Sequence, residues 1–147
     1  ADAVRFFNVE PRIAVLSYSN FGSSQGEVPA KAAKAAALAK SKFPNLVIDG
    51  DIQANIALNT EIQQNNYPFS ELAEKGANTL IFPGLASGNI AYKLLMEIGG
   101  AEAIGPILLG MNKPVHVLQL GSSVREIVNM VAIAVVEAQI NQSMVPA

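Results

Sequence analysis

Short apolar runs alternate along this chain with segments in which apolar residues recur at helical spacing. Each run is bounded by proline, glycine or polar residues, which predicts buried β-strands. The predicted strands lie at residues 12–17, 46–48, 78–82 and 113–118. The main predicted helices lie at residues 27–43, 89–98 and 124–141. This alternation predicts an α/β domain of three layers, with helices on both faces of a mostly parallel sheet.

The domain proper is predicted to span residues 12–141, between a lead-in at 1–11 and a frayed tail at 142–147. The lead-in carries adjacent phenylalanines that need a surface to pack against, so we expect it to continue from a preceding part of a longer polypeptide. Residues 103–110 contain Pro106, which predicts a sheet edge or a strand start. The last helix is apolar on most sides, so it is expected at the domain centre or in a subunit interface.

Three turns follow predicted strands and precede helices, at residues 19–24, 84–89 and 121–123. Free backbone N–H groups at such turns suit an anionic or carbonyl-bearing ligand, and the carboxyl edge of a parallel sheet gathers them. The first turn matches neither a dinucleotide-binding glycine motif nor a P-loop. In the third, Ser123 and Glu126 have the spacing of a capping box. The alternative is a set of plain connections with no ligand.

Other polar residues have two interpretations each. Asp49 and Asp51 suit acid–base chemistry or the capping of a helix N-terminus. His116, on a predicted strand, is interpreted as a structural histidine, with a catalytic role as the alternative. The lysines of the first long helix form a solvated face or, alternatively, a site for the phosphate groups of a ligand. These lysines are Lys31, Lys34, Lys40 and Lys42.

Composition narrows the functional classes. Half of the 147 residues are hydrophobic, only 15% are charged and the net charge is −2. The sequence pI of about 5.3 argues against a nucleic-acid partner. With no cysteine and a single histidine, neither a thiolate nor a multi-histidine metal site is expected. No apolar run reaches the roughly 20 residues of a membrane span and no signal peptide is evident, so a cytoplasmic protein is expected.

Several motifs in order resemble the phosphate acetyl/butyryltransferase family, from about Arg12 to Gln139. They include Leu-Ser-Tyr-Ser at 16–19, Ile-Asp-Gly at 48–50, Ile-Phe-Pro at 81–83, Ser-Gly-Asn-Ile-Ala-Tyr-Lys at 87–93, Gly-Gly-Ala-Glu-Ala-Ile-Gly-Pro-Ile-Leu at 99–108 and Lys-Pro-Val at 113–115. The resemblance implies an isocitrate/isopropylmalate dehydrogenase-like α/β/α fold with coenzyme A bound between two subdomains. This chain resembles the second subdomain with its returning C-terminal helix.

The resemblance, taken with the three turns, gives a set of candidate ligand-binding residues and no metal site. These candidates are Ser19, Asn20, Gly22, Ser23, Asp49, Gln53, Asn89, Lys93, Gly121 and Ser122.

The chain departs from the family at the residues associated with transfer chemistry. Family members carry a serine, an arginine and an aspartate around the third turn, where this chain has Gln119, Leu120 and Glu126. A further family arginine is replaced by Glu97. Electrostatic stabilisation of an oxyanion is often the largest catalytic contribution. We therefore expect no catalytic residues here and the loss of acyl transfer, although Glu126 as a base remains an alternative.

This combination resembles the C-terminal phosphotransacetylase-like domain of large bacterial NADP-dependent malic enzymes, in the run from Arg5 to Ala14 and from His116 to Gly121. The resemblance implies a non-catalytic domain that senses acetyl-CoA and assembles into a homodimer or higher oligomer. NADP and a divalent metal (Mg or Mn) would then serve other domains of the same polypeptide, which convert malate to pyruvate and CO2. A divergent phosphate acetyltransferase and a purely structural module are the alternatives.

Overall fold

A computed structural model describes residues 1–143, including the side chains of residues 1–140. The chain forms two compact units, the first from Ala1 to Lys93 and the second from Leu94 onward. The first unit contains α1 (Asp2–Arg5), β1 (Arg12–Leu16), α2 (Glu27–Lys42), β2 (Val47–Ile52), α3 (Ala54–Leu58), α4 (Thr60–Asn66) and β3 (Thr79–Ile81). Helix α5 (Leu85–Glu97) runs from the first unit into the second, which also contains α6 (Val124–Ser143).

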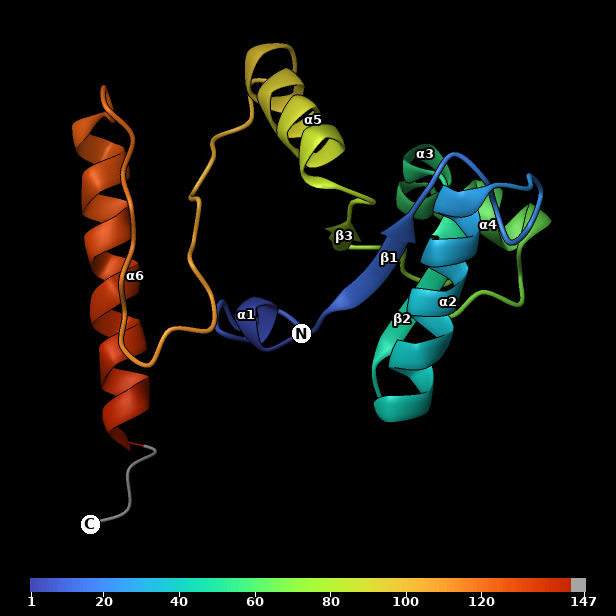
Figure 1. Ribbon diagram of the computed structural model, residues 1–147, viewed down its shortest axis with the longest axis horizontal. Helices are drawn as coiled ribbons and strands as arrows, with labels where there is room; N and C mark the ends of the chain where they lie inside the picture. The colour runs from blue at the N-terminus through green and yellow to red at the C-terminus, as the bar shows by residue number, and fades with distance from the viewer. Residues whose placement is uncertain (144–147) are drawn as a thin grey trace. The chain divides into compact units, whose positions relative to one another are not determined.

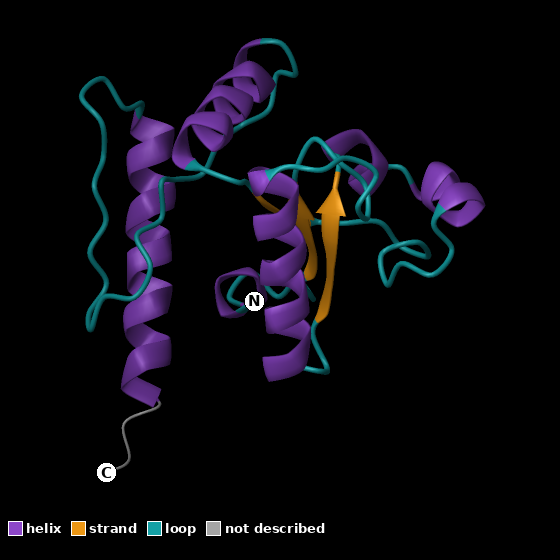
Figure 2. Ribbon diagram, turned by 45° about the vertical axis from the view of Figure 1, so that its right-hand side comes forward, coloured by secondary structure: helices purple, strands orange, loops and turns teal. Residues whose placement is uncertain are grey.

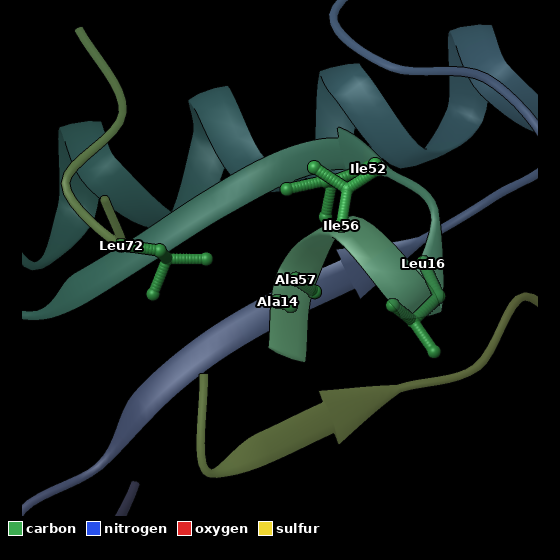
Figure 3. Packing of buried hydrophobic residues seen from close by; sticks show 6 residues of the cluster. All are labelled: Ala14, Leu16, Ile52, Ile56, Ala57 and Leu72. Carbon is green, nitrogen blue, oxygen red and sulfur yellow. The ribbon is translucent and has the colours of Figure 1, made fainter. Parts of the chain in front are cut away.

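The first unit has a parallel sheet in the order β2-β1-β3, visible in Figure 1. Alternate side chains of β1 pack on opposite faces of this sheet. Ile13 and Val15 contact the α2 side, where Ala32 and Ala36 allow the helix to approach closely. Ala14 and Leu16 join a second cluster whose other members are Ile52, Ile56, Ala57 and Leu72 (Figure 3). Helices therefore cover both faces of a central sheet, which confirms the predicted fold class.

The sheet contains a bulge in β2 that the sequence did not predict. The register shifts between Ala14 and Leu16, so that Gly50 and Asp51 lie opposite Val15 alone. Gly50 has a φ of 146°, and a Cβ atom there would lie 2.4 Å from the Val15 carbonyl oxygen. Only glycine fits this position, since a side chain would meet both a forbidden backbone conformation and a fixed backbone atom.

Residues 70–75 form a turn whose centre is buried. Leu72 is fully buried and Ala73 is 6% exposed. Leu72 completes the cluster on the α3 face of the sheet (Figure 3). The turn is therefore part of the core of the first unit.

The second unit corrects two strand predictions. Residues 103–110 and 113–118 form neither helix nor strand and are drawn as loop in Figure 2. An apolar run forms a strand only where a neighbour pairs with its backbone, and no described segment pairs with these residues. The turn before α6 is thus preceded by extended chain, with Leu120 fully exposed, and not by a buried strand.

Helix α6 begins at its predicted residue and extends to Ser143, and its exposed valines argue against the domain centre, which is one of the two positions predicted for it. Met130 and Ile133 are buried, whereas many of its valines are at least two fifths exposed. These exposed valines are Val124, Val128, Val131, Val135 and Val136. A subunit interface stays a prediction for this face. Within residues 1–143, no helix is both long and apolar enough to cross a bilayer.

The lead-in forms the short helix α1, in which no residue is buried. The two phenylalanine rings that follow it pack edge to face, with centroids 5.1 Å apart. Phe7 remains 47% exposed, so these rings contact each other without entering the core.

Candidate functional site

The loop that follows β1 is closed by its own serine side chains. The Ser17 hydroxyl oxygen accepts the Ser19 N–H at 2.9 Å. The Ser19 hydroxyl is fully buried, accepts the Ser24 N–H at 3.1 Å and lies 3.3 Å from the Ser23 hydroxyl. The Ser23 oxygen in turn accepts the Asn20 N–H at 2.9 Å. The hydroxyls thus hold the loop in one conformation.

The same loop is joined to the carboxyl end of β2 through four hydrogen bonds. The Asn20 Oδ1 atom accepts the Gln53 N–H at 2.8 Å, and Gln53 Nε2 donates to the Tyr18 carbonyl oxygen at 2.8 Å. The Phe21 N–H donates to the Asp51 carbonyl at 2.7 Å, and the Gly22 N–H to Asp51 Oδ1 at 3.2 Å. The structure therefore brings together half of the candidate residues, and their binding of a ligand stays a prediction. Those brought together are Ser19, Asn20, Gly22, Ser23 and Gln53.

Asp49 lies in a separate ion-pair network. Its Oδ1 atom lies 3.1 Å from Lys40 Nζ, and Lys40 Nζ also lies 3.0 Å from Glu71 Oε1. Asp49 Oδ2 accepts the Glu71 N–H at 3.2 Å, and Asp49 is only 6% exposed. Through these bonds Asp49, on β2, is joined to α2 and to the turn at 70–75. Its role in the structure is to hold these three segments together, and the sequence did not reveal this role.

Two interpretations of polar residues are corrected by this network. Lys40 is not part of a solvated lysine face, because its ammonium group is shared by two carboxylates. Neither Asp49 nor Asp51 caps a helix, since Gln53 is the N-cap residue of α3. Burial acts to lower the pKa of Lys40, but hydrogen bonds and charges of Glu71 and Asp49 outweigh it, so that the pKa is raised above its ordinary value.

Asn89 and Lys93 lie on the exposed surface of α5. The turn that precedes them, after β3, is held by the Ser87 hydroxyl, which donates to the Gly84 carbonyl at 2.8 Å. The ammonium of Lys93 lies 4.8 Å from the centroid of the Tyr92 ring. These two candidates are accessible to a ligand, and their role stays a prediction.

The turn before α6 forms the predicted capping box. The Ser123 N–H donates to Glu126 Oε2 at 2.6 Å, and the Glu126 N–H donates to the Ser123 hydroxyl at 3.2 Å. Gly121 has a φ of 88°, and the Ser122 hydroxyl donates to the Gln119 carbonyl at 2.9 Å. Because this turn belongs to the second unit, the predicted gathering of the three turns stays a prediction.

A hollow of about 230 Å³ lies beside this capping box within the second unit. Ser123 and Glu126 line it on one side, together with the ion pair formed by Arg125 and Glu102. Glu97, at the position of a family arginine, is exposed at the end of α5. The capping carboxylate therefore borders a space large enough for a small group, while its oxygen is engaged by a backbone N–H.

His116 is buried and hydrogen-bonded, as expected of a structural histidine. Its side chain is 3% exposed, and Nε2 lies 3.1 Å from Glu137 Oε2 on α6. Its Nδ1 atom is buried without a hydrogen-bond partner. The pair therefore links the segment before α6 to the C-terminal half of that helix.

Replacement of Glu137 by alanine is expected to loosen the second unit. It leaves the buried Nε2 atom of His116 without its partner, at a cost of about 1 kcal/mol. Hydrogen exchange of the α6 amides should become about fivefold faster. The matched control is Glu102→Ala, which removes a solvent-exposed ion pair with Arg125 and should change exchange little. Equal effects of the two substitutions would contradict the structural role of the His116–Glu137 pair.

Comparison with known proteins places this α/β domain in a family. A model of the family described as phosphate acetyl/butaryl transferase matches residues 1–135. The chain is 44% identical over 137 residues to the phosphate acetyltransferase of Clostridium acetobutylicum, covering 93% of this chain and 41% of that protein. It is 45% identical over 141 residues to the NADP-dependent malic enzyme of Escherichia coli, covering 95% of this chain and 18% of that protein.

The structural comparison agrees. A phosphotransacetylase from Streptococcus pyogenes superimposes with a TM-score of 0.88 and 39% identity, covering 95% of this chain and 42% of that one. The chain belongs to the phosphate acetyl/butyryl transferase family, as its motifs predicted. It spans about two fifths of the length of the matched transferase and less than a fifth of the matched malic enzyme.

Proposed function

We propose that this chain is a regulatory and oligomerisation domain of an NADP-dependent malic enzyme, that it binds acetyl-CoA, and that it does not catalyse acyl transfer. NADP and a divalent metal would serve the malic reaction in other domains of the polypeptide, and this domain itself would need no cofactor. Sequence identity of 45% to a malic enzyme supports this proposal, but the identity of 44% to a transferase is equally high. The chemistry of the turn before α6 must therefore separate the two functions.

The observation that carries the proposal is that the turn before α6 keeps its backbone hydrogen bonds but has no cationic side chain at residues 119 and 120. The carboxylate of Glu126 accepts the Ser123 N–H at 2.6 Å, so its described role is to close a helix end. Gln119 and Leu120 stand where family members carry a serine and an arginine, and neither side chain supplies a positive charge. Stabilising a developing oxyanion requires donors directed at it, and each is worth a few kcal/mol. A turn with intact backbone architecture and no such charge suits ligand binding without reaction.

The hydroxyl-rich loop after β1 supports retained binding. Its backbone and side chains are held by several hydrogen bonds between the loop and β2, so little conformational entropy would be lost when a ligand binds. A ligand that regulates must also bind two states of the enzyme with different affinity. The exposed valine face of α6 supports the assembly role, because association would remove this apolar surface from water.

Calorimetric titration of the full-length polypeptide with acetyl-CoA tests the binding proposal. We expect saturable binding that is detected at or below millimolar acetyl-CoA. Absence of binding at millimolar acetyl-CoA would refute the regulatory function. In that case the purely structural module is the remaining alternative, and light scattering tests it by measuring the oligomeric state. This alternative requires an oligomer that dissociates when the α6 valines are replaced by polar residues.

The enzymatic alternative rests on the hollow beside Glu126, where this carboxylate would act as a base. We expect acetyl-CoA formation from acetyl phosphate and coenzyme A at the background rate in both the wild type and Glu126→Ala. Ser123→Ala is the matched control, because it breaks the same capping box, at about 1 kcal/mol, and keeps the carboxylate. Turnover that is lost in Glu126→Ala but kept in Ser123→Ala would establish the alternative and contradict our proposal.

A further inference from the structure

Three aromatic rings form a cluster beside the hydroxyl-rich loop. The ring of Phe69 lies edge to face with Phe21, at 5.0 Å between centroids, and with Tyr67, at 6.2 Å. Phe21 and Tyr67 lie 5.3 Å apart, and both pack against the buried cluster on the α3 face of the sheet. Phe69 nevertheless remains 68% exposed. The cluster thus has a half-buried base and one ring open to solvent.

The cluster is held from both sides by backbone contacts. Phe21 has a φ of 48°, a conformation that is costly for a bulky residue and persists only where the surroundings enforce it. Its N–H is bound by the Asp51 carbonyl at 2.7 Å, and the adjacent Gly22 N–H is bound by the Asp51 carboxylate. On the other side, the Glu71 N–H is bound by Asp49. Phe69 is therefore held between two fixed segments.

The position of the cluster relates it to the candidate ligand-binding loop. Phe21 lies between Asn20 and Gly22, whose polar groups belong to the loop network after β1. Because the ring centroids of Phe21 and Phe69 lie 5.0 Å apart, Phe69 is beside this loop, where it can meet a planar ring attached to a polar group that binds there. Stacking of a nucleobase on an exposed aromatic ring stabilises binding and needs no hydrogen bond to the base edge.

We propose that Phe69, supported by Phe21 and Tyr67, is the stacking surface for the adenine ring of a nucleotide-containing ligand. This inference rests on the proposed binding of acetyl-CoA and adds a residue that determines affinity for its adenine part. It also explains why a large apolar ring is kept exposed on a preformed base. Phe43, which is 60% exposed, lies at the end of α2 and has no neighbouring aromatic ring among the described residues.

Calorimetry on the full-length polypeptide tests this with coenzyme A, 4′-phosphopantetheine and adenosine 3′,5′-bisphosphate as probes. Phe69→Ala should lower the affinity for coenzyme A and for the bisphosphate about tenfold, and it should leave the affinity for 4′-phosphopantetheine unchanged. Phe69→Trp should restore affinity, because it returns an aromatic face. Phe43→Ala is the matched control and should change the affinity of no probe.

The outcomes separate this inference from the proposed function. Coenzyme A binding that is unaffected by Phe69→Ala would overturn the stacking surface alone. Equal weakening of 4′-phosphopantetheine would also overturn it, because the substitution would then act on the loop as a whole. A third outcome is that coenzyme A does not bind, while the bisphosphate binds with an affinity that Phe69→Ala lowers. The proposed function would then fail and the stacking surface would stand. A change of oligomeric state without a change of affinity would assign Phe69 to a subunit interface and overturn the inference.

Discussion

Replacement of Gly50 by alanine is expected to destabilise the first unit by about 3 kcal/mol or more. The added Cβ would lie 2.4 Å from the Val15 carbonyl oxygen and 3.0 Å from the Val15 Cβ, and both belong to the central strand. The φ of 146° is also one that alanine rarely adopts. Backbone strain alone costs about 1–3 kcal/mol, and the steric overlap adds to it.

Urea unfolding followed by tyrosine fluorescence measures this effect on the first unit. The chain has three tyrosines and no tryptophan, and Tyr18, Tyr67 and Tyr92 all lie before Leu94. The matched control is Gly84→Ala, since a Cβ at Gly84 would meet nothing within 4 Å. We expect the control to change the free energy of unfolding by less than about 0.5 kcal/mol. A Gly50→Ala protein as stable as the control would contradict the bulge described for β2.

Replacement of Lys40 by methionine is expected to cost about 2 kcal/mol. It removes the cation that lies 3.1 Å from Asp49 Oδ1, and Asp49 is too deeply buried for water to replace this partner fully. Breaking a fully buried pair costs about 3–5 kcal/mol, and we discount this figure because the Lys40 side chain is 35% exposed and therefore partly screened. Adding Asp49→Asn should recover part of the loss by removing the buried charge.

The same measurement has a defined dependence on pH. Since Glu71 and Asp49 raise the pKa of folded Lys40 above 10.5, its contribution is fully present below the unfolded pKa. The contribution is lost as the pH rises through the folded pKa. The difference in unfolding free energy between the wild type and Lys40→Met should therefore be constant near neutrality and shrink above pH 10.5. Lys34 lies on the exposed face of α2, so Lys34→Met should have the same free energy of unfolding as the wild type. A loss of unfolding free energy in Lys34→Met equal to that in Lys40→Met would contradict the ion-pair network.

Local signals in the sequence predicted the structure correctly where the interaction is itself local. The capping box joins residues three apart, so that its spacing alone predicted both of its hydrogen bonds. The length of α6 likewise followed from a continuous helical pattern that begins at this cap. The fold class followed from the alternation of apolar runs with helical segments, because each element must cover the apolar face of another.

The features that the sequence did not predict depend on contacts between segments that are far apart in the chain. Lys40, Asp49 and Glu71 come from α2, β2 and a turn, and no spacing rule predicts that they share an ion pair. The bulge had one signal, a glycine inside a strand, but its partner Val15 is far away in sequence. The segment at 113–118 has a strand-like pattern without a described strand beside it, so the pattern alone predicted the wrong element.

The central claim is that this chain senses acetyl-CoA for an NADP-dependent malic enzyme. The most direct test is the rate of NADP-dependent malate oxidation by the full-length polypeptide, measured against acetyl-CoA with and without this domain. We predict that acetyl-CoA changes the rate of the intact protein, and that the response disappears when the domain is removed. A rate that does not depend on acetyl-CoA in the intact protein, or a response that persists without the domain, would contradict this account.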